Sequence, residues 1–140
     1  RTQLVNFFHL REGQRLVDLP GYGYAKVAAN VRRHWANLMA DYFEMRHSLH
    51  GMFLIVDIRR GLTDFDRQML QFADAIGLPT HILLTKTDKL KRGQAASALH
   101  GVRRELGDAA TVQHFSAQTR LGEDEARQTL EAFLKKPPQQ

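Results

Sequence analysis

Leu16-Val17-Asp18-Leu19-Pro20-Gly21-Tyr22-Gly23-Tyr24-Ala25 is the stretch that decides the fold of this chain. It is typical of an apolar strand that ends in an aspartate and passes into a loop with two glycines. Glycine lets the main chain approach a ligand closely, and open α/β sheets bind ligands at the carboxyl ends of their strands. By itself the Pro-Gly-Tyr-Gly run is more typical of an ordinary turn. An acid beside bare N–H groups nevertheless suits a phosphate and its metal ion.

Two later stretches favour the ligand-binding interpretation. Thr85-Lys86-Thr87-Asp88 closes the apolar run at 81–84, and Ser116-Ala117 closes the run at 111–115. Three strand ends followed by three loop motifs, in this order, form the pattern of a guanine-nucleotide-binding domain.

Strand and helix patterns alternate along the chain. A hairpin is expected over 3–10 and 14–18, and Thr63 with Asp66 predicts the start of a helix that Gly77 ends. The remaining expected strands are 51–57, 81–84 and 110–115, and the remaining expected helices are 28–46, 93–106 and 123–134. This alternation predicts a mostly parallel sheet with helices on both sides. We expect one domain over residues 1–136 and a disordered tail at 137–140, where two prolines stop the last helix.

Composition narrows the classes of protein that fit. The 140 residues contain no cysteine, which excludes a disulfide framework and a cysteine-based zinc site. The longest apolar run, at 52–56, is too short to cross a bilayer, so we expect a soluble protein that is not secreted and has no membrane partner. The net charge of +5 favours an anionic partner such as RNA, although many small domains are mildly basic for no such reason.

Asp88 is the sharpest candidate for reading a base. Guanine presents N1–H and N2–H₂ side by side, and a carboxylate accepts from both through charge-assisted bonds, whereas adenine has no such donor pair. The aliphatic stem of Lys86 would lie along the base, and the N–H of Ala117 would donate to guanine O6 from a loop shaped by Ser116. A polar strand-to-helix loop with a Lys–Asp pair is the ordinary alternative.

Asp18 is the candidate for holding Mg²⁺, through a water, because Mg²⁺ keeps much of its hydration. The N–H of Gly21 would face the terminal phosphate, and loss of that contact would release residues 22–27 as a switch. Thr2 could add a hydroxyl to the same ion, although an N-terminal threonine is more often merely solvated.

The chain closely resembles the EngB (YihA/YsxC) family of bacterial ribosome-assembly GTPases, within the TRAFAC class. The matching pieces run in order through the whole chain: Arg1-Thr2-Gln3 leading into residues 4–8, then 16–25, 57–59, 85–90 and Phe115-Ser116-Ala117. The resemblance implies a Ras-like G domain of the three-layer P-loop NTPase fold. It also implies GTP binding and hydrolysis to GDP, Mg²⁺, a cytoplasmic role in maturing the large (50S) ribosomal subunit, and a link to cell division and septation. The implied partners are ribosomal RNA and ribosomal proteins, and we expect a monomer.

The resemblance also implies roles for single residues. Thr2 matches the first-switch threonine on Mg²⁺, and Asp18 begins the second-switch motif. The nucleotide-binding residues carried over are Arg1, Thr2, Gln3, Leu4, Asp18, Leu19, Pro20, Gly21, Thr85, Lys86, Thr87, Asp88, Phe115, Ser116 and Ala117, with Thr2 and Asp18 on the metal.

The chain departs from the family pattern at its start. It contains no Gly-Lys pair and so lacks the phosphate-binding Gly-x-x-x-x-Gly-Lys-Ser/Thr loop. The missing strand, loop and helix would need roughly thirty or more residues. We therefore expect a piece of a longer protein whose sheet has a gap, and which as given binds nucleotide weakly or not at all and is inactive.

Two substitutions within the motifs also depart from common GTPases. Tyr22 stands where many of them have the glutamine that orients the attacking water, so we expect slow intrinsic hydrolysis, and we assign no catalytic residue. Thr85 stands where most have asparagine, a milder change that the EngB family shares.

Two other functions remain as alternatives. The first is a non-catalytic RNA- or protein-binding module derived from a GTPase fold, which the missing phosphate loop supports. The second is an α/β enzyme with Asp18 and Asp57 as acid–base partners, although nothing places a nucleophile beside them. Arginine and lysine clusters at 32–33, 59–60, 89–92 and 103–104 could contact RNA phosphates or could equally be solvated surface.

Overall fold

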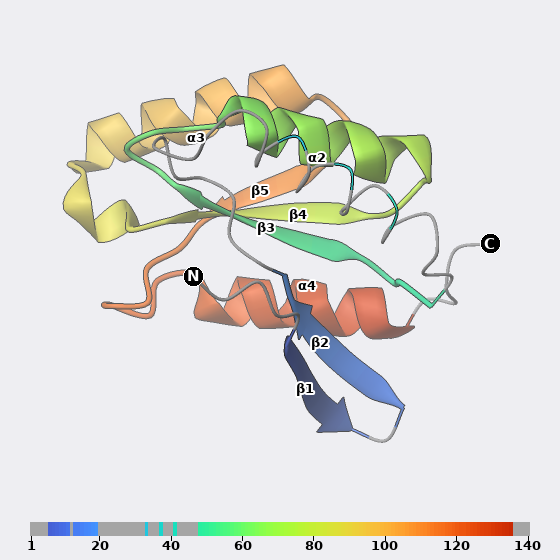
Figure 1. Ribbon diagram of the computed structural model, residues 1–140. Helices are drawn as coiled ribbons and strands as arrows, with labels where there is room; N and C mark the ends of the chain where they lie inside the picture. The colour runs from blue at the N-terminus through green and yellow to red at the C-terminus, as the bar shows by residue number, and fades with distance from the viewer. Residues whose placement is uncertain are drawn as a thin grey trace. The chain divides into compact units, whose positions relative to one another are not determined.

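The computed structural model describes residues 6–11, 13–19, 33, 37, 41 and 48–135. The chain divides into two compact units, Arg1–Met39 and Ala40–Gln140. Each unit is described here by itself (Figure 1). The helix expected over 28–46 and the tail at 137–140 lie outside the described residues, apart from positions 33, 37 and 41.

The first unit contains the expected hairpin. β1 (Asn6–Arg11) pairs antiparallel with β2 (Gln14–Asp18), and Gly13 takes a positive φ of 76° in the turn between them. The register pairs Phe7 with Val17 and Asn6 with Asp18, so β2 ends at the aspartate as its sequence predicts.

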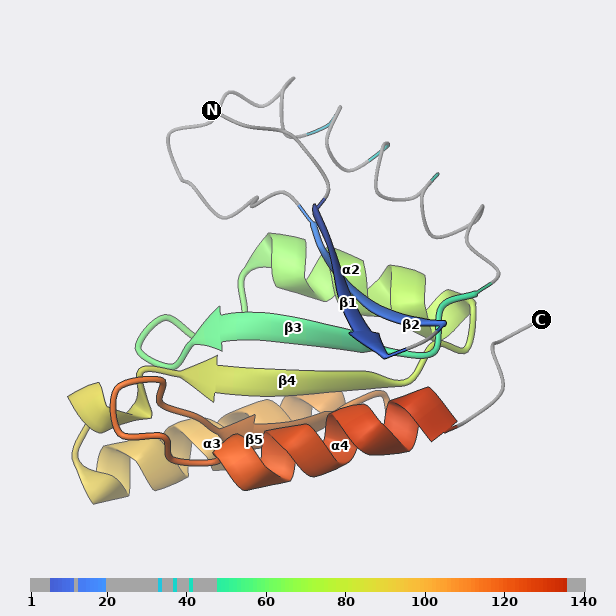
Figure 2. The ribbon, with the colours of Figure 1, turned by 90° about the horizontal axis from the view of Figure 1, so that it is seen from below.

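The second unit is a three-stranded parallel sheet in the order β3-β4-β5, formed by β3 (Met52–Asp57), β4 (Thr80–Thr85) and β5 (Thr111–His114). β4 lies in the middle, and five of its six residues are buried, as expected for a strand covered on both faces. Because the strands are parallel, their carboxyl ends meet at one edge (Figure 2).

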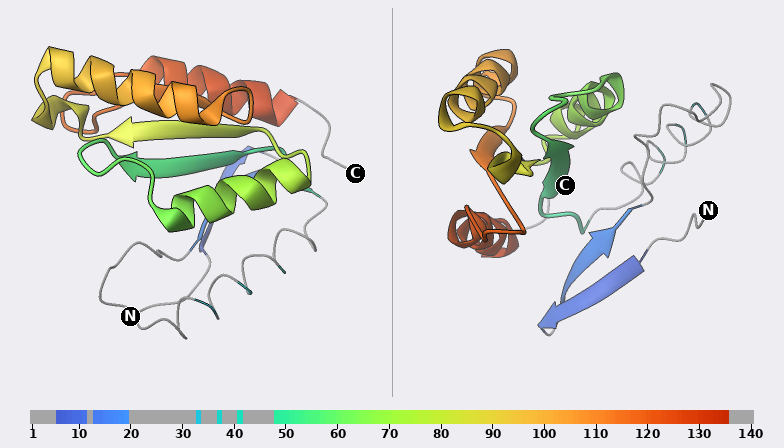
Figure 3. Two further views of the ribbon diagram at one scale, coloured as in Figure 1. Left: turned by 90° about the horizontal axis from the view of Figure 1, so that it is seen from above. Right: turned by 90° about the vertical axis from the view of Figure 1, so that its left-hand side faces the viewer.

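Three α-helices cover the two faces of this sheet. α2 (Asp64–Ala75) and α3 (Arg92–Leu106) lie on one face and α4 (Glu123–Lys135) on the other (Figure 3). α2 begins with the predicted capping box, in which Asp66 N–H donates to Thr63 Oγ1 and Thr63 N–H donates to the Asp66 carboxylate. Gly77, with φ of 69°, follows the end of α2 as expected. The alternation of helices with a parallel sheet confirms the predicted α/β class.

In the part of the chain that the structure describes, no helix combines the length and the apolar character needed to cross a bilayer.

Candidate functional site

The candidate site lies at the edge of the sheet where β3, β4 and β5 end. The loop after β4 contains Thr85 to Asp88 and forms a short 3₁₀ turn, η1 (Thr87–Lys89). The loop after β5 contains Phe115 to Ala117. The structure brings these two predicted loops together, because β4 and β5 are neighbours in parallel register.

Thr87 joins the two loops through its main chain and its side chain. Its N–H donates to the carbonyl of Phe115 at 3.1 Å, and its buried Oγ1 accepts from the Phe115 N–H at 3.3 Å. The same hydroxyl donates to the carbonyl of Leu84 at 2.9 Å. Thr85 in turn donates from Oγ1 to the Val56 carbonyl at 3.1 Å, which ties the loop back to β3.

Asp88 and Ser116 make the most informative contact of the site. Ser116 is fully buried, and its Oγ donates to Asp88 Oδ1 at 2.7 Å while accepting from the Thr119 N–H at 3.1 Å. Asp88 Oδ2 lies 3.9 Å from Lys89 Nζ, which is too far for a hydrogen bond. The Asp88 side chain keeps 19% of its surface accessible, and among the described residues Ser116 makes the hydrogen bond that orients its carboxylate, so lone pairs remain for a ligand at the surface.

Lys86 precedes Asp88 in the loop after β4, and Ala117 follows Ser116 in the loop after β5. Lys86 is exposed and takes a left-handed conformation, with φ of 62° and ψ of 30°, which is uncommon for a residue with a side chain and typical of functional loops. Ala117 is exposed, and its N–H has no acceptor among the described residues. Both observations fit the predicted contacts to a base.

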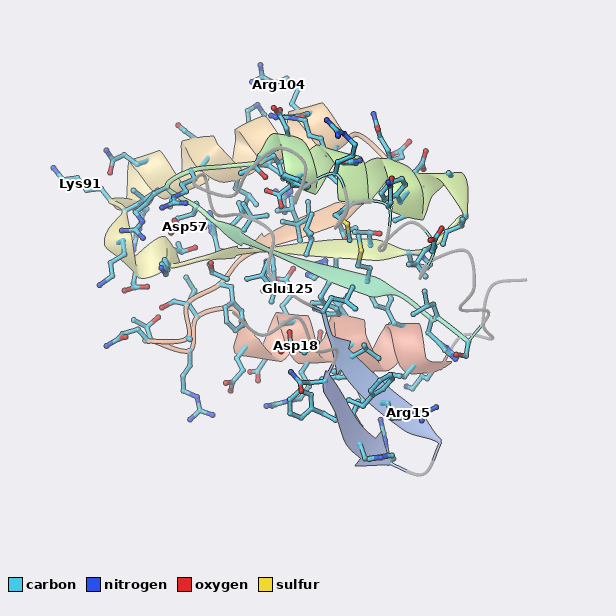
Figure 4. All side chains as sticks on the ribbon, viewed as in Figure 1. Arg15, Asp18, Asp57, Lys91, Arg104 and Glu125 are labelled. Atoms are coloured by element: carbon cyan, nitrogen blue, oxygen red, sulfur yellow. The ribbon has the colours of Figure 1, made fainter. Side chains whose placement is uncertain are left out.

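Asp57, at the end of β3, forms a charged cluster with Arg59 and with Lys86 of the loop after β4. Arg59 donates two side-chain bonds to Asp57, at 2.7 Å and 3.1 Å, and its main-chain N–H donates a third at 2.9 Å. Lys86 Nζ lies 3.6 Å from the same carboxylate. The hydrogen bonds from Arg59 hold the pKa of Asp57 well below its usual range. Asp57, labelled in Figure 4 at the end of β3, is therefore ionised at neutral pH and is unsuited to act as a general acid.

The other predicted site residues lie in the first unit or outside the described residues. Asp18 is exposed at the last position of β2, and Leu19 follows it half-buried. Arg1, Thr2, Gln3, Leu4, Pro20 and Gly21 lie outside the described residues. Among the residues that are described, no group of three or more histidine, aspartate or glutamate side chains is placed to hold a metal ion.

Sequence reasoning missed two residues beside these loops. Gln113 in β5 and Gly122 after the second loop are linked by a hydrogen bond of 2.8 Å from the Gln113 side chain to the Gly122 carbonyl. β5 is mostly polar in sequence, so no pattern singled out Gln113, whereas a glycine directly before a helix was the available signal for Gly122.

Comparison with curated proteins finds a GTP-binding relative. The chain is 48% identical over 138 residues to the probable GTP-binding protein EngB of Stenotrophomonas maltophilia (strain K279a), a match that covers 96% of this chain and 69% of that relative. No family model matches the chain.

Solved structures show the same fold. A crystal structure of a probable GTP-binding protein EngB matches with a TM-score of 0.76 at 16% identity, covering 96% of this chain and 85% of that one. Translation elongation factor SelB from Methanococcus maripaludis, in complex with the GTP analogue GppNHp, matches with a TM-score of 0.67 at 18% identity, covering 97% of this chain and 29% of that one. The chain thus spans less than a third of SelB. At identities this low, the two structural matches support the same fold and nothing finer.

Proposed function

Because the chain belongs to the EngB family of GTP-binding proteins, we propose that it is part of a GTPase that acts as a switch in assembly of the large (50S) ribosomal subunit. The protein binds GTP and GDP at the carboxyl edge of the sheet and hydrolyses GTP to GDP and phosphate. Ribosomal RNA and ribosomal proteins of the subunit precursor are its partners, it works in the cytoplasm as a monomer, and its loss disturbs cell division and septation.

The hydrogen bond between Ser116 and Asp88 carries this proposal. It joins the loops after β4 and β5 and, within the described part of the chain, leaves the Asp88 carboxylate partly exposed with lone pairs for a ligand. A carboxylate oriented in this way accepts from guanine N1–H and N2–H₂ together, and each charge-assisted bond contributes about 1.5–3 kcal/mol. Lys86 then lies along the base, and the Ala117 N–H donates to O6.

Hydrolysis by such a site rests on positioning and charge neutralisation. Asp18, with an exposed carboxylate at the end of β2, has the oxygen chemistry that Mg²⁺ prefers, and Thr2 adds a hydroxyl in this proposal. Mg²⁺ would neutralise phosphate charge. Arg1, Gln3, Leu4, Leu19, Pro20 and Gly21 complete the phosphate side of the proposed site.

Titration with a fluorescent GDP tests the function, in the protein as its gene encodes it. We expect micromolar binding that weakens when EDTA removes Mg²⁺, and a loss of at least about 100-fold in Asp88→Ala, because both base contacts disappear. Asp108→Ala is the matched control: Asp108 is exposed just before β5, at the opposite edge of the sheet.

Two results would count against the switch. Absence of GDP binding in the unsubstituted protein would support the non-catalytic RNA- or protein-binding module instead. Binding that survives in Asp88→Ala would show that the nucleotide does not use this edge.

A further inference from the structure

Gln113 is a buried polar side chain in β5, which pairs with the central strand β4. It is 2% exposed and lies between Val112 and His114 in β5. Its amide nitrogen donates to the carbonyls of His114 at 2.9 Å and Gly122 at 2.8 Å. With both N–H groups directed at carbonyls, its Oε1 faces His81 Nε2 at 2.8 Å as the acceptor, so that the His81 ring donates from Nε2.

His81 anchors this amide to the central strand. The ring is 2% exposed in β4, and its Nδ1 lies 2.6 Å from Thr111 Oγ1. Edge-on contact with Phe53, with ring centroids 5.4 Å apart, fixes the ring further. The Gln113 carboxamide is therefore held on its oxygen side by His81 of the central strand and on its nitrogen side by the carbonyls of His114 and Gly122.

The two carbonyls that Gln113 binds flank the loop at 115–121. His114 is the last residue of β5, and Gly122 immediately precedes α4. A second hydrogen bond also joins the two ends of this loop, which we call its neck, and runs from the Ser116 N–H to the Leu121 carbonyl at 3.0 Å. Gly122 has a φ of 79°, and a Cβ there would collide with the His114 carbonyl, so only glycine lets the two ends approach this closely.

We propose that Gln113 is a positioning residue for recognition of the guanine base, an assignment that rests on the function proposed above. By clamping both ends of the loop, Gln113 fixes Ser116, whose hydroxyl orients the Asp88 carboxylate, and Ala117, whose N–H faces O6. The base contacts are thereby formed before the nucleotide arrives, so less ordering is needed on binding. If Gln113 only satisfied buried polar groups of the core, its substitution would lower stability but would not change the preference for guanine over other bases.

The test compares GDP with IDP, whose hypoxanthine base lacks the N2 amino group. We expect the unsubstituted protein to bind GDP about 10- to 100-fold more tightly than IDP, the value of one charge-assisted bond. In Gln113→Met, which keeps the side-chain size and removes the donors, we expect this ratio to fall by about 10-fold, mainly through faster GDP dissociation. Gln113→Glu, which retains only acceptors, should behave in the same way.

Thr111→Val is the matched control, because it removes the other partner of His81 without contacting the loop. We expect it to lower the unfolding temperature while leaving the GDP-to-IDP ratio unchanged. A ratio in Gln113→Met and Gln113→Glu equal to that of Thr111→Val would overturn the proposal. Absence of GDP binding in the unsubstituted protein would instead refute the function on which the proposal rests.

Amide hydrogen exchange on the unsubstituted, nucleotide-free protein tests the same proposal without any substitution. A loop clamped in advance predicts strong protection of the Ser116 N–H, which bridges the neck. Unprotected exchange at Ser116 before nucleotide binding would contradict it.

Discussion

Asp57 is a carboxylate held in its charged form by its neighbours. The bidentate bonds from Arg59 and the approach of Lys86 at 3.6 Å both stabilise the anion. The hydrogen bonds to Asp57 in turn raise the pKa of the Arg59 guanidinium, and the charge of Asp88 adds a smaller effect in the same direction.

The lowered pKa of Asp57 makes one contribution to stability dependent on pH. Because the folded pKa lies below the unfolded one, the contribution is complete above the ordinary carboxyl pKa of about 4. It is lost as the pH falls from there through the depressed pKa of the folded state. In Arg59→Met we expect the Asp57 carboxyl resonance to titrate at higher pH in NMR, and acid unfolding to begin at higher pH.

Arg60→Met is the control for this titration, because the main-chain N–H of Arg60 bonds to the Asp57 carbonyl and survives the substitution. An unchanged Asp57 titration in Arg59→Met would show that another group lowers the pKa.

At the scale of elements, Phe133 connects α4 to the sheet. Phe133, 9% exposed, meets Phe53 of β3 edge-on with ring centroids 5.6 Å apart. His50 Nδ1 also lies 3.2 Å from the Phe133 carbonyl. Gly51, just before β3, lies so close that a Cβ there would collide with the Phe133 ring. The helix can approach the sheet at this point because residue 51 has no side chain.

Gly51→Ala should therefore lower the free energy of unfolding by about 1–3 kcal/mol, the usual cost of overpacking. Gly101→Ala in α3 is the matched control, because nothing lies within 4 Å of a Cβ at that position. There we expect a gain of about 0.5–1 kcal/mol from helix propensity. Urea unfolding of both variants checks this, and equal effects would exclude the close contact with Phe133.

For the whole molecule, periodicity and loop motifs in the sequence predicted the described strands β1 to β5 and the α-helices α2 to α4 to within three residues, but not the short 3₁₀ turn η1. The reason is that buried parallel strands and amphipathic helices leave clear apolar patterns, and Thr63 and Gly77 mark the two ends of α2. The contact between the loops of Asp88 and Ser116 was also predictable, since neighbouring parallel strands end at one edge.

Other parts of the site were not predictable from the sequence. The bonds of Gln113 depend on three-dimensional contacts between β4, β5 and the chain at 122, which no local pattern reveals. The Arg59 bonds to Asp57 depend on side-chain conformation, which local sequence does not determine. Asp18 and Asp88 belong to different compact units, so their common role in one nucleotide site stays a prediction.

Nucleotide binding by the Asp88→Asn variant tests most directly whether Asp88 reads guanine. Xanthine has a carbonyl at position 2 where guanine has an amino group, so an asparagine amide can donate to it while accepting from N1–H. We expect Asp88→Asn to bind GDP about 10- to 100-fold more weakly than the unsubstituted protein and to bind XDP more tightly by a similar factor. An Asp88→Asn protein that keeps its preference for GDP over XDP would contradict the assignment.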